Sequence, residues 1–175
     1  TGADCSADLQ QLRGRLQELV EAAKPLLDPG QFEALQRFSE QHLETIGQYA
    51  QGIRLLSYCP DSIQARILGA GEQFSVRLMQ ALLQARQARC AVLDAAQLVR
   101  SQGDYLNAVA DIPATQAAFA ALDVQDGVAI RIMAGFVSGL PNGEMALLGR
   151  NGSDYSAAII AAGVKASACE IWTDV

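Results

Sequence analysis

The residues best suited to chemistry lie in the last quarter of the chain, where a cation, a glycine-rich turn and the expected start of a helix come together. The apolar run 145–148 predicts a strand, and the turn 149–152 follows it. A helix is expected to start near Ser153, a good N-cap residue, with its free backbone N–H groups beside Arg150. Such an arrangement can bind a carboxylate or a phosphate.

The elements around this turn are expected to present it at the edge of a sheet. Asp154 suits the first turn of a helix, and the alanine-rich run 157–162 favours helix. A second strand is predicted at 169–173, with Trp172 in the core. Strand, helix and strand with such short connections form a βαβ unit, which brings strand ends and the helix N-terminus to one edge. Ligands tend to bind at that edge.

Two motifs in this region resemble the aspartokinase signature, within the amino acid kinase family. They are Gly149-Arg150-Asn151-Gly152-Ser153-Asp154 and, after it, Trp172-Thr173-Asp174-Val175. Upstream, Met133-Ala134-Gly135-Phe136 resembles the family's strand-end segment, and Gly71-Glu72 followed by Ser75 resembles its substrate-side Gly-Glu helix. The motifs occur in the family's order, and the similarity extends from Leu12 to Val175.

The asparagine-containing motif, together with Cys59-Pro60-Asp61-Ser62-Ile63, more narrowly resembles the kinase part of a bifunctional aspartokinase/homoserine dehydrogenase. Aspartokinases open with a Lys-Phe-Gly-Gly-Thr-Ser segment that supplies a phosphate-contacting lysine, and no such segment occurs here. The two lysines, Lys24 and Lys165, follow no strand in a glycine-rich context. We therefore expect residues 1–175 to be an internal piece of the catalytic domain, its substrate-side lobe, inactive on its own. The start of the phosphate loop and the end of the nucleotide lobe would be missing.

The composition predicts a globular domain. With 175 residues, half of them hydrophobic, the chain is long enough for one domain with a buried core. A net charge of −6 and a pI near 4.7 argue against a nucleic acid partner, which requires a basic face. No apolar run approaches the roughly 18 residues of a membrane span and no signal-peptide pattern is present, so we expect a cytoplasmic protein. Four widely spaced cysteines without a C-x-x-C pair predict neither a zinc site nor disulfides.

A helical hairpin is predicted at the N-terminal end. Residues 7–23 and 31–46 carry apolar side chains at helical spacing, and Asp28-Pro29-Gly30 is the expected turn between them. The apolar stripes are expected to be core, and aspartokinases have a helical insertion at the corresponding place. His42, the single histidine, lies on this hairpin and is expected to be a solvated surface residue.

The next expected helical unit covers 60–86, with Asp61-Ser62 as capping candidates and a glycine break at Gly69 and Gly71. Glu72 follows that break. From its position alone, Glu72 is either a solvated acid that complements the helix dipole or a carboxylate that holds the ammonium group of an amino acid. The resemblance assigns the second role to the matching glutamate.

Further along, the chain alternates helices with strands. Apolar runs predict strands at 90–93, 105–112 and 128–133, a helix at 113–122, and a hairpin over 136–148 that turns at Pro141-Asn142-Gly143. This alternation predicts an α/β class with a largely parallel sheet. The resemblance implies the amino acid kinase fold, in which a largely parallel sheet lies between helix layers. Here that fold would be incomplete and would carry the helical hairpin at its N-terminus.

The resemblance implies transfer of the γ-phosphoryl group of ATP, with Mg²⁺, to the side-chain carboxylate of L-aspartate, in the biosynthesis of lysine, threonine and methionine. Such chemistry needs positioning and charge neutralisation more than covalent catalysis. Arg150 would pair with a substrate carboxylate, Glu72 would bind the substrate ammonium, and Ser153 would line the substrate site. Asp154 would act beside Arg150 in catalysis by orienting a lysine or a Mg²⁺-bound phosphate. The nucleotide side would consist of Gly135, Phe136, Thr173 and Asp174. The full-length protein is expected to be a homo-oligomer with no nucleic acid or membrane partner and no resident metal site.

Two other functions stay open. Another family member, acting on glutamate, acetylglutamate or carbamate, would share the fold, although the joint presence of Glu72 and the Arg150 motif disfavours it. The chain could also be a non-catalytic fragment or binding module of the amino acid kinase fold that has lost the phosphate lysine. A substrate panel separates the first alternative from an aspartokinase, and aspartate binding without ATP binding would support the second.

Overall fold

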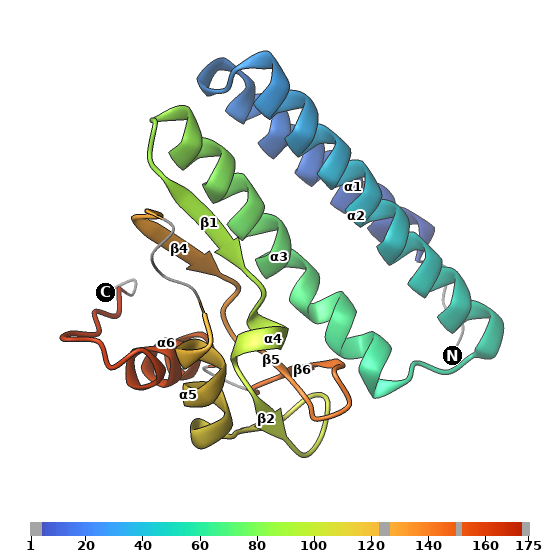
Figure 1. The fold of residues 1–175 in the computed structure, drawn as a ribbon. Helices are drawn as coiled ribbons and strands as arrows, with labels where there is room; N and C mark the ends of the chain where they lie inside the picture. The colour runs from blue at the N-terminus through green and yellow to red at the C-terminus, as the bar shows by residue number, and fades with distance from the viewer. Residues whose placement is uncertain (1–4, 123–126, 150–151, 173–175) are drawn as a thin grey trace.

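The computed structural model describes residues 5–122, 127–149 and 152–172, and it begins with a helical hairpin (Figure 1). Helix α1, Ser6–Ala23, ends in a short 3₁₀ turn, Lys24–Leu26, and helix α2, Pro29–Leu56, runs back along it. The predicted hairpin is confirmed, but Asp28 caps α2 and Pro29 and Gly30 belong to its first turn. The Asp28 carboxylate accepts a hydrogen bond from the Gln31 N–H at 2.9 Å, and the Gln31 side chain accepts one from the Asp28 N–H. This capping box fixes the start of α2.

Helix α3, Asp61–Ala85, packs along α2. The apolar stripes of the three helices form a core, as predicted for the first two; its buried members are Leu16, Val20, Ala23, Leu35, Leu43, Phe74 and Ala81. Pro60 holds the N-cap position of α3, and no side chain caps it. The predicted capping by Asp61 or Ser62 is therefore wrong, because both residues already lie inside the helix.

Helix α3 is continuous, so the predicted break at Gly69 and Gly71 is also wrong. Gly69 lies where α3 packs on strand β6, Met145–Leu147, and a Cβ atom there would stand 2.9 Å from Met145 Cε. The missing side chain permits this close approach. A glycine inside a helix costs only about 1 kcal/mol, which the packing of a buried helix face can offset.

His42 is not a solvated surface residue, in contrast to the prediction. Its side chain is half-buried between α2 and α3, where Nε2 lies 2.8 Å from the carbonyl oxygen of Ala70. The imidazole also stacks on the ring of Phe38, with the ring centroids 5.4 Å apart. The hairpin is thus joined to α3 by a polar contact as well as by the apolar core.

A parallel strand pair lies beside α3. Strand β1, Cys90–Leu93, pairs with strand β4, Ile130–Met133, with Cys90 opposite Ile130. The predicted strands at 90–93 and 128–133 are confirmed, the second in a shorter form. Helix α3 packs on both strands (Figure 1). The chain is therefore a mixed helix and strand fold of the α/β class with a parallel pair, as expected.

Two further strand pairs in the described chain are antiparallel. Strand β5, Val137–Gly139, pairs with β6 through the predicted turn at 141–143. Strand β2, Ser101–Gln102, pairs with β3, Val109–Ala110. Of the strand predicted at 105–112, only Val109 and Ala110 lie in a strand. The Asp111 carboxylate accepts a hydrogen bond from the Ala114 N–H at 3.0 Å and starts helix α5, Ile112–Ala120, in the region predicted as helical.

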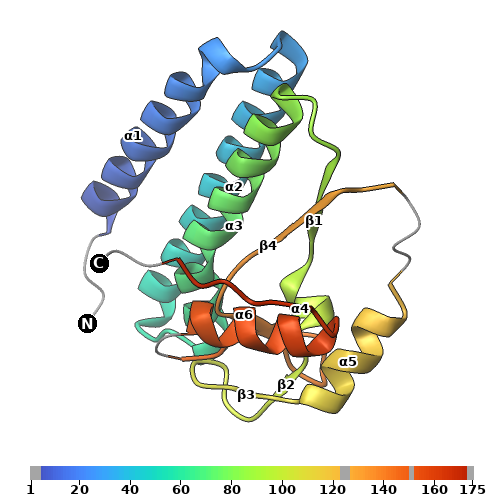
Figure 2. The ribbon, with the colours of Figure 1, turned by 90° about the vertical axis from the view of Figure 1, so that its left-hand side faces the viewer.

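Helix α6, Gly152–Gly163, packs on α5, on the side of the strands away from the hairpin (Figures 1 and 2). The strand predicted at 169–173 does not form over residues 169–172, so the predicted βαβ unit around α6 is wrong. Strand β6 instead pairs with β5, and residues 164–172 are exposed without the ladder partner that a strand requires. Trp172 is 89% exposed rather than in the core.

All four cysteines are free, and Cys90 is the buried one. Among the helices of the described ranges, none combines the length and the apolar character that crossing a bilayer requires.

Candidate functional site

A pocket opens where the two parallel strands end. Asp94 follows β1 and Ala134 follows β4, and both line a cavity of about 250 Å³. Gln73 and Val76 of α3 line its other side. Ligands of α/β proteins commonly bind at the carboxyl ends of parallel strands. Asp94, which also caps the short helix α4, Ala95–Leu98, was not recognised in the sequence, although an acid directly after a strand is a usable signal.

The start of α6 lies directly against the segment that leaves β4. A Cβ atom on Gly135 would stand 2.8 Å from the Ser153 Oγ, and one on Gly152 would stand 2.5 Å from the Phe136 Cβ. Neither position has room for a side chain unless the neighbouring residue moves. The structure therefore brings together Gly135, Phe136 and Ser153, which the sequence placed in two separate motifs.

Phe136 holds this contact in an unusual conformation. Its φ of 45° lies in the left-handed region, which residues other than glycine rarely adopt. The Phe136 N–H donates to the Ser156 Oγ at 3.2 Å, and its carbonyl accepts from the Leu148 N–H at 2.8 Å. Ser156, which is 2% exposed, donates in turn to the Ser153 carbonyl at 2.8 Å. These bonds tie the strand end, β6 and α6 into one unit.

Ser156 was missed in the sequence. It follows Ser153 by about one helical turn, so both serines lie on the same helix face. That spacing could have marked Ser156 as a second candidate residue. The predicted N-cap role of Ser153 is wrong, because α6 already begins at Gly152. Ser153 and Asp154 are exposed in the first turn of α6, and neither side chain makes a hydrogen bond or ion pair within the described residues.

Glu72 lies on α3, whose neighbouring residue Gln73 lines the strand-end pocket. The Glu72 side chain is half-buried, and its carboxylate has no hydrogen bond or ion pair in the described part of the chain. Gln73 donates from Nε2 to the Met145 Sδ at 3.4 Å, which joins this turn of α3 to strand β6. Glu72 is thus a half-buried acid that has no counterion among the described residues, and it lies beside the pocket rather than in its lining.

Three predicted site residues, Arg150, Thr173 and Asp174, lie outside the described residues. The turn that leads to Arg150 can be followed as far as Gly149, whose φ is 76°. A Cβ atom there would overlap the Asn107 side chain, so both the backbone conformation and the available space require glycine.

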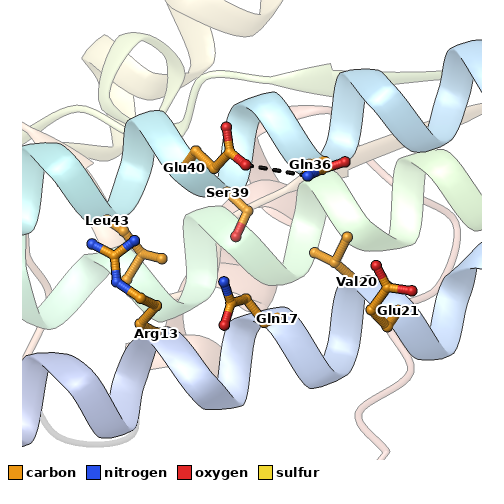
Figure 3. A pocket seen from close by; sticks show the side chains of 8 residues that line it. All are labelled: Arg13, Gln17, Val20, Glu21, Gln36, Ser39, Glu40 and Leu43. Carbon is orange, nitrogen blue, oxygen red and sulfur yellow. Dashed lines mark hydrogen bonds between the residues drawn. The ribbon is translucent and has the colours of Figure 1, made fainter.

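A second cavity, of about 210 Å³, lies in the helical hairpin (Figure 3). The side chains that line it come from α1 and α2: Arg13, Gln17, Val20, Glu21, Gln36, Ser39, Glu40 and Leu43. The Gln36 amide donates to the Glu40 carboxylate at 3.2 Å across one helical turn. Neither cavity is lined by a predicted site residue. The strand-end pocket is the candidate site because two of its lining residues, Gln73 and Ala134, are the chain neighbours of the predicted site residues Glu72 and Gly135.

Among the described residues, two groups with shifted pKa values lie elsewhere. The hydrogen bond with Glu144 raises the pKa of Tyr105, and the hydrogen bond from the Ala114 N–H lowers the pKa of Asp111. Within the described ranges, no group of three or more acidic, histidine or cysteine side chains could hold a metal ion. The candidate site therefore combines a strand-end pocket with the start of α6 and with two carboxylates, Glu72 and Asp154, that have no partner among the described residues. Such groups suit a charged organic ligand.

The sequence profile of the amino acid kinase family matches residues 11–175. The chain is similar to two bifunctional aspartokinase/homoserine dehydrogenases. It is 36% identical over 81% of this chain to the one from Buchnera aphidicola subsp. Acyrthosiphon pisum, and 42% identical over 70% to the one from Haemophilus influenzae. It is 30% identical over 89% of its length to the aspartokinase of Schizosaccharomyces pombe.

The fold is similar to a crystal structure of Escherichia coli aspartokinase III in complex with aspartate and ADP. The TM-score is 0.72 at 26% identity, and the match covers 91% of this chain and 40% of that one. The chain spans only 17%, 15% and 30% of the three relatives named above. The similarity therefore concerns one part of considerably longer proteins.

Proposed function

The chain belongs to the amino acid kinase family, and on that premise we propose that it is part of the catalytic domain of an aspartate kinase. The reaction is transfer of the γ-phosphoryl group of ATP to the side-chain carboxylate of L-aspartate. The observation that carries the proposal is the packing of Gly135 and Phe136 against the start of α6, at the carboxyl ends of parallel strands. The aspartokinase relatives, and the structure with aspartate and ADP, support the choice of substrates.

The phosphate side of the site is the N-terminus of α6. Free backbone N–H groups at a helix start, reinforced by the helix dipole, stabilise anionic oxygens. Ser153 adds a hydroxyl that is not used elsewhere in the described structure. Gly135, which has no side chain, lets the start of α6 pack directly against the strand end. With Phe136, it forms the floor of the proposed nucleotide site, to which Thr173 and Asp174 would contribute from beyond the described residues.

The substrate side is formed by Glu72 and Arg150. Glu72 would accept hydrogen bonds from the ammonium group of aspartate, because a half-buried carboxylate gains most from a cation that replaces its lost hydration. Arg150 would pair with a carboxylate of aspartate, and its planar guanidinium permits two parallel hydrogen bonds. Because Glu72 is negative and Arg150 is positive, the pair would select a zwitterionic substrate and fix its orientation in the site.

ATP normally reacts as its Mg²⁺ complex, and the residues of this site fit that form. Mg²⁺ is commonly held by one or two carboxylates together with the substrate phosphates, rather than by an all-protein cage. Asp154, an exposed carboxylate in the first turn of α6, is suited to be that ligand. The metal would neutralise charge on the phosphates, while the chain's own groups orient the two reactants and exclude water.

The test is an ATP-dependent kinase assay on the complete protein that contains this chain. The acceptors are aspartate, glutamate, N-acetylglutamate and carbamate, and hydroxylamine traps an acyl phosphate as its hydroxamate. We expect ADP and hydroxamate to form with aspartate only. Turnover with another acceptor would assign a different kinase of the family. Binding of aspartate without binding of ATP would assign a non-catalytic module.

A further inference from the structure

One turn of α3 is held from two sides. On the strand side, a Cβ atom on Gly69 would lie 2.9 Å from Met145 Cε and 3.5 Å from Val137 Cγ2, and Gln73 donates to the Met145 Sδ. On the hairpin side, His42 of α2 lies against the carbonyl of Ala70. Glu72 belongs to the same turn and makes none of these contacts itself.

The contact of His42 is a directed hydrogen bond. A carbonyl oxygen can only accept, so the His42 Nε2 at 2.8 Å carries the proton and donates. Stacking on Phe38, with an angle of 20° between the rings, fixes the plane of the imidazole. Phe38 also lines the strand-end pocket, so this part of α2 contacts both the pocket and α3.

The position of the bonded carbonyl explains why such a contact is useful. Ala70 stands between Gly69 and Gly71, and glycine allows the backbone more conformations than any other residue. Gly71 has no neighbour near the place of its missing Cβ, so packing does not restrain it. A hydrogen bond to the carbonyl between the two glycines therefore restrains the helix where its backbone has the most conformational freedom.

We infer that His42 is a positioning residue for Glu72, which it holds in place through the Ala70 carbonyl. This inference rests on the proposed function, in which the Glu72 carboxylate binds the ammonium group of the amino acid substrate. Misplacement by about 1 Å can cost as much as a hundredfold in rate. His42 affects amino acid binding specifically, because the described groups of the proposed nucleotide site lie after β4 and at the start of α6, and the contacts of His42 are with Ala70 and Phe38.

Two variants separate the hydrogen bond from the ring in the complete protein. His42→Phe keeps an aromatic ring against Phe38 but removes the donor, whereas His42→Gln keeps an N–H donor and removes the ring. Thr45→Val is the matched control, because it removes an exposed hydrogen bond from α2, from the Thr45 Oγ1 to the Gln41 carbonyl, that does not reach α3. Steady-state kinetics with aspartate and with ATP are measured for all three variants.

We expect His42→Phe to raise the KM for aspartate about threefold to tenfold, the loss that one hydrogen bond can cause, with the KM for ATP unchanged. His42→Gln and Thr45→Val should stay within about twofold of wild type. An unchanged aspartate KM in His42→Phe, or equal changes for both substrates, would overturn the inference.

Amide hydrogen exchange gives a readout that does not depend on turnover. In His42→Phe, exchange should become faster in the turn 69–74 of α3 and stay unchanged in α6. Equal exchange in wild type and His42→Phe would overturn the positioning role, whatever the activity. If the wild-type protein showed no aspartate-dependent turnover, the proposed function would be wrong. The positioning role of His42 would still be tested, because amide hydrogen exchange reports whether His42 restrains this turn.

Discussion

Gly135 and Ser153 come from motifs far apart in the sequence, yet a Cβ atom on Gly135 would stand 2.8 Å from the Ser153 Oγ and 3.1 Å from the Ser153 Cβ. Cβ atoms essentially never stand within 3.0 Å of another atom, so a side chain at position 135 would require Ser153 to shift. Both elements line the proposed phosphate site. In the proposed site, the close contact would place the strand-end backbone and the helix N–H groups beside the same anion.

Gly135→Ala should separate these two elements. We expect the free energy of unfolding to fall by about 1–3 kcal/mol, the usual cost of overpacking, and kinase activity of the complete protein to be lost in the same variant. Urea denaturation and the aspartate-dependent assay measure the two effects.

Gly47→Ala is the control for Gly135→Ala. Gly47 lies inside α2 with no atom within 4 Å of the missing Cβ, so alanine should be neutral or stabilising by up to about 1 kcal/mol. If Gly135→Ala behaved like Gly47→Ala in both assays, the close fit would have no energetic or functional weight.

The sequence predicted the elements that depend on local pattern. Helical spacing of apolar residues located α1 and the first part of α2, and the run 90–93 matched strand β1. The turn residues at 141–143 marked the hairpin of β5 and β6. These features depend on neighbours a few residues away, which a sequence displays directly.

The features that the sequence did not predict correctly depend on tertiary contacts. Two glycines predicted a break in α3, but packing of Gly69 on Met145 keeps that helix continuous. The apolar run before Trp172 predicted a strand, but residues 169–172 have no ladder partner in the described chain. The hydrogen bond from His42 to the Ala70 carbonyl joins two helices, and no local sequence pattern predicts it. Likewise, the motifs named Gly135 and Ser153 but could not show that they touch.

Ser156→Ala should destabilise the candidate site. The Phe136 N–H would lose its acceptor in a partly buried place, and an unsatisfied backbone donor there costs about 1–3 kcal/mol. Phe136 would then be held in its left-handed conformation by fewer contacts. Ser75→Ala, which removes an exposed hydrogen bond to the Gly71 carbonyl, should change the free energy of unfolding by less than about 0.5 kcal/mol. Equal values for the two variants would argue against the role of Ser156.

Asp111 should make the stability depend on pH. Hydrogen bonds from the Ala114 N–H and then from the Gln102 side chain lower the pKa of Asp111 below its usual value of 3.8. A carboxyl whose pKa is lower in the folded state stabilises the fold above its unfolded pKa, and this contribution disappears as the pH falls through the folded pKa. The advantage of wild type over Asp111→Ala in thermal melting should therefore be full at pH 5 to 7, roughly, and shrink below about pH 4.

The control for Asp111 is Asp104→Ala, since the Asp104 side chain makes no hydrogen bond or ion pair among the described residues. Its melting temperature should follow that of wild type at each pH. A difference between wild type and Asp111→Ala that stayed constant down to pH 3 would contradict the role of the ionised cap.

Arg150→Lys tests the carboxylate contact of the substrate site. Lysine keeps the charge but cannot make two parallel hydrogen bonds, so the aspartate kcat/KM of the complete protein should fall at least about tenfold. In Arg150→Ala the aspartate kcat/KM should fall further. The KM for ATP should change little in Arg150→Lys. An unchanged kcat/KM for aspartate in Arg150→Ala would exclude this contact.

Glu72→Gln tests the ammonium contact. Glutamine fits the same space on α3 but has no charge, and a hydrogen bond to a charged group contributes about 1.5–3 kcal/mol, so the aspartate kcat/KM should fall about tenfold to a hundredfold. The fold should be unaffected, because the Glu72 carboxylate has no partner to lose in the described structure. Glu33→Gln, an exposed acid on α2, controls for the change in net charge. Succinate lacks the α-amino group, so the kcat/KM for succinate should differ between wild type and Glu72→Gln far less than the kcat/KM for aspartate does. Were the two enzymes to differ equally with both substrates, Glu72 would not bind the ammonium group.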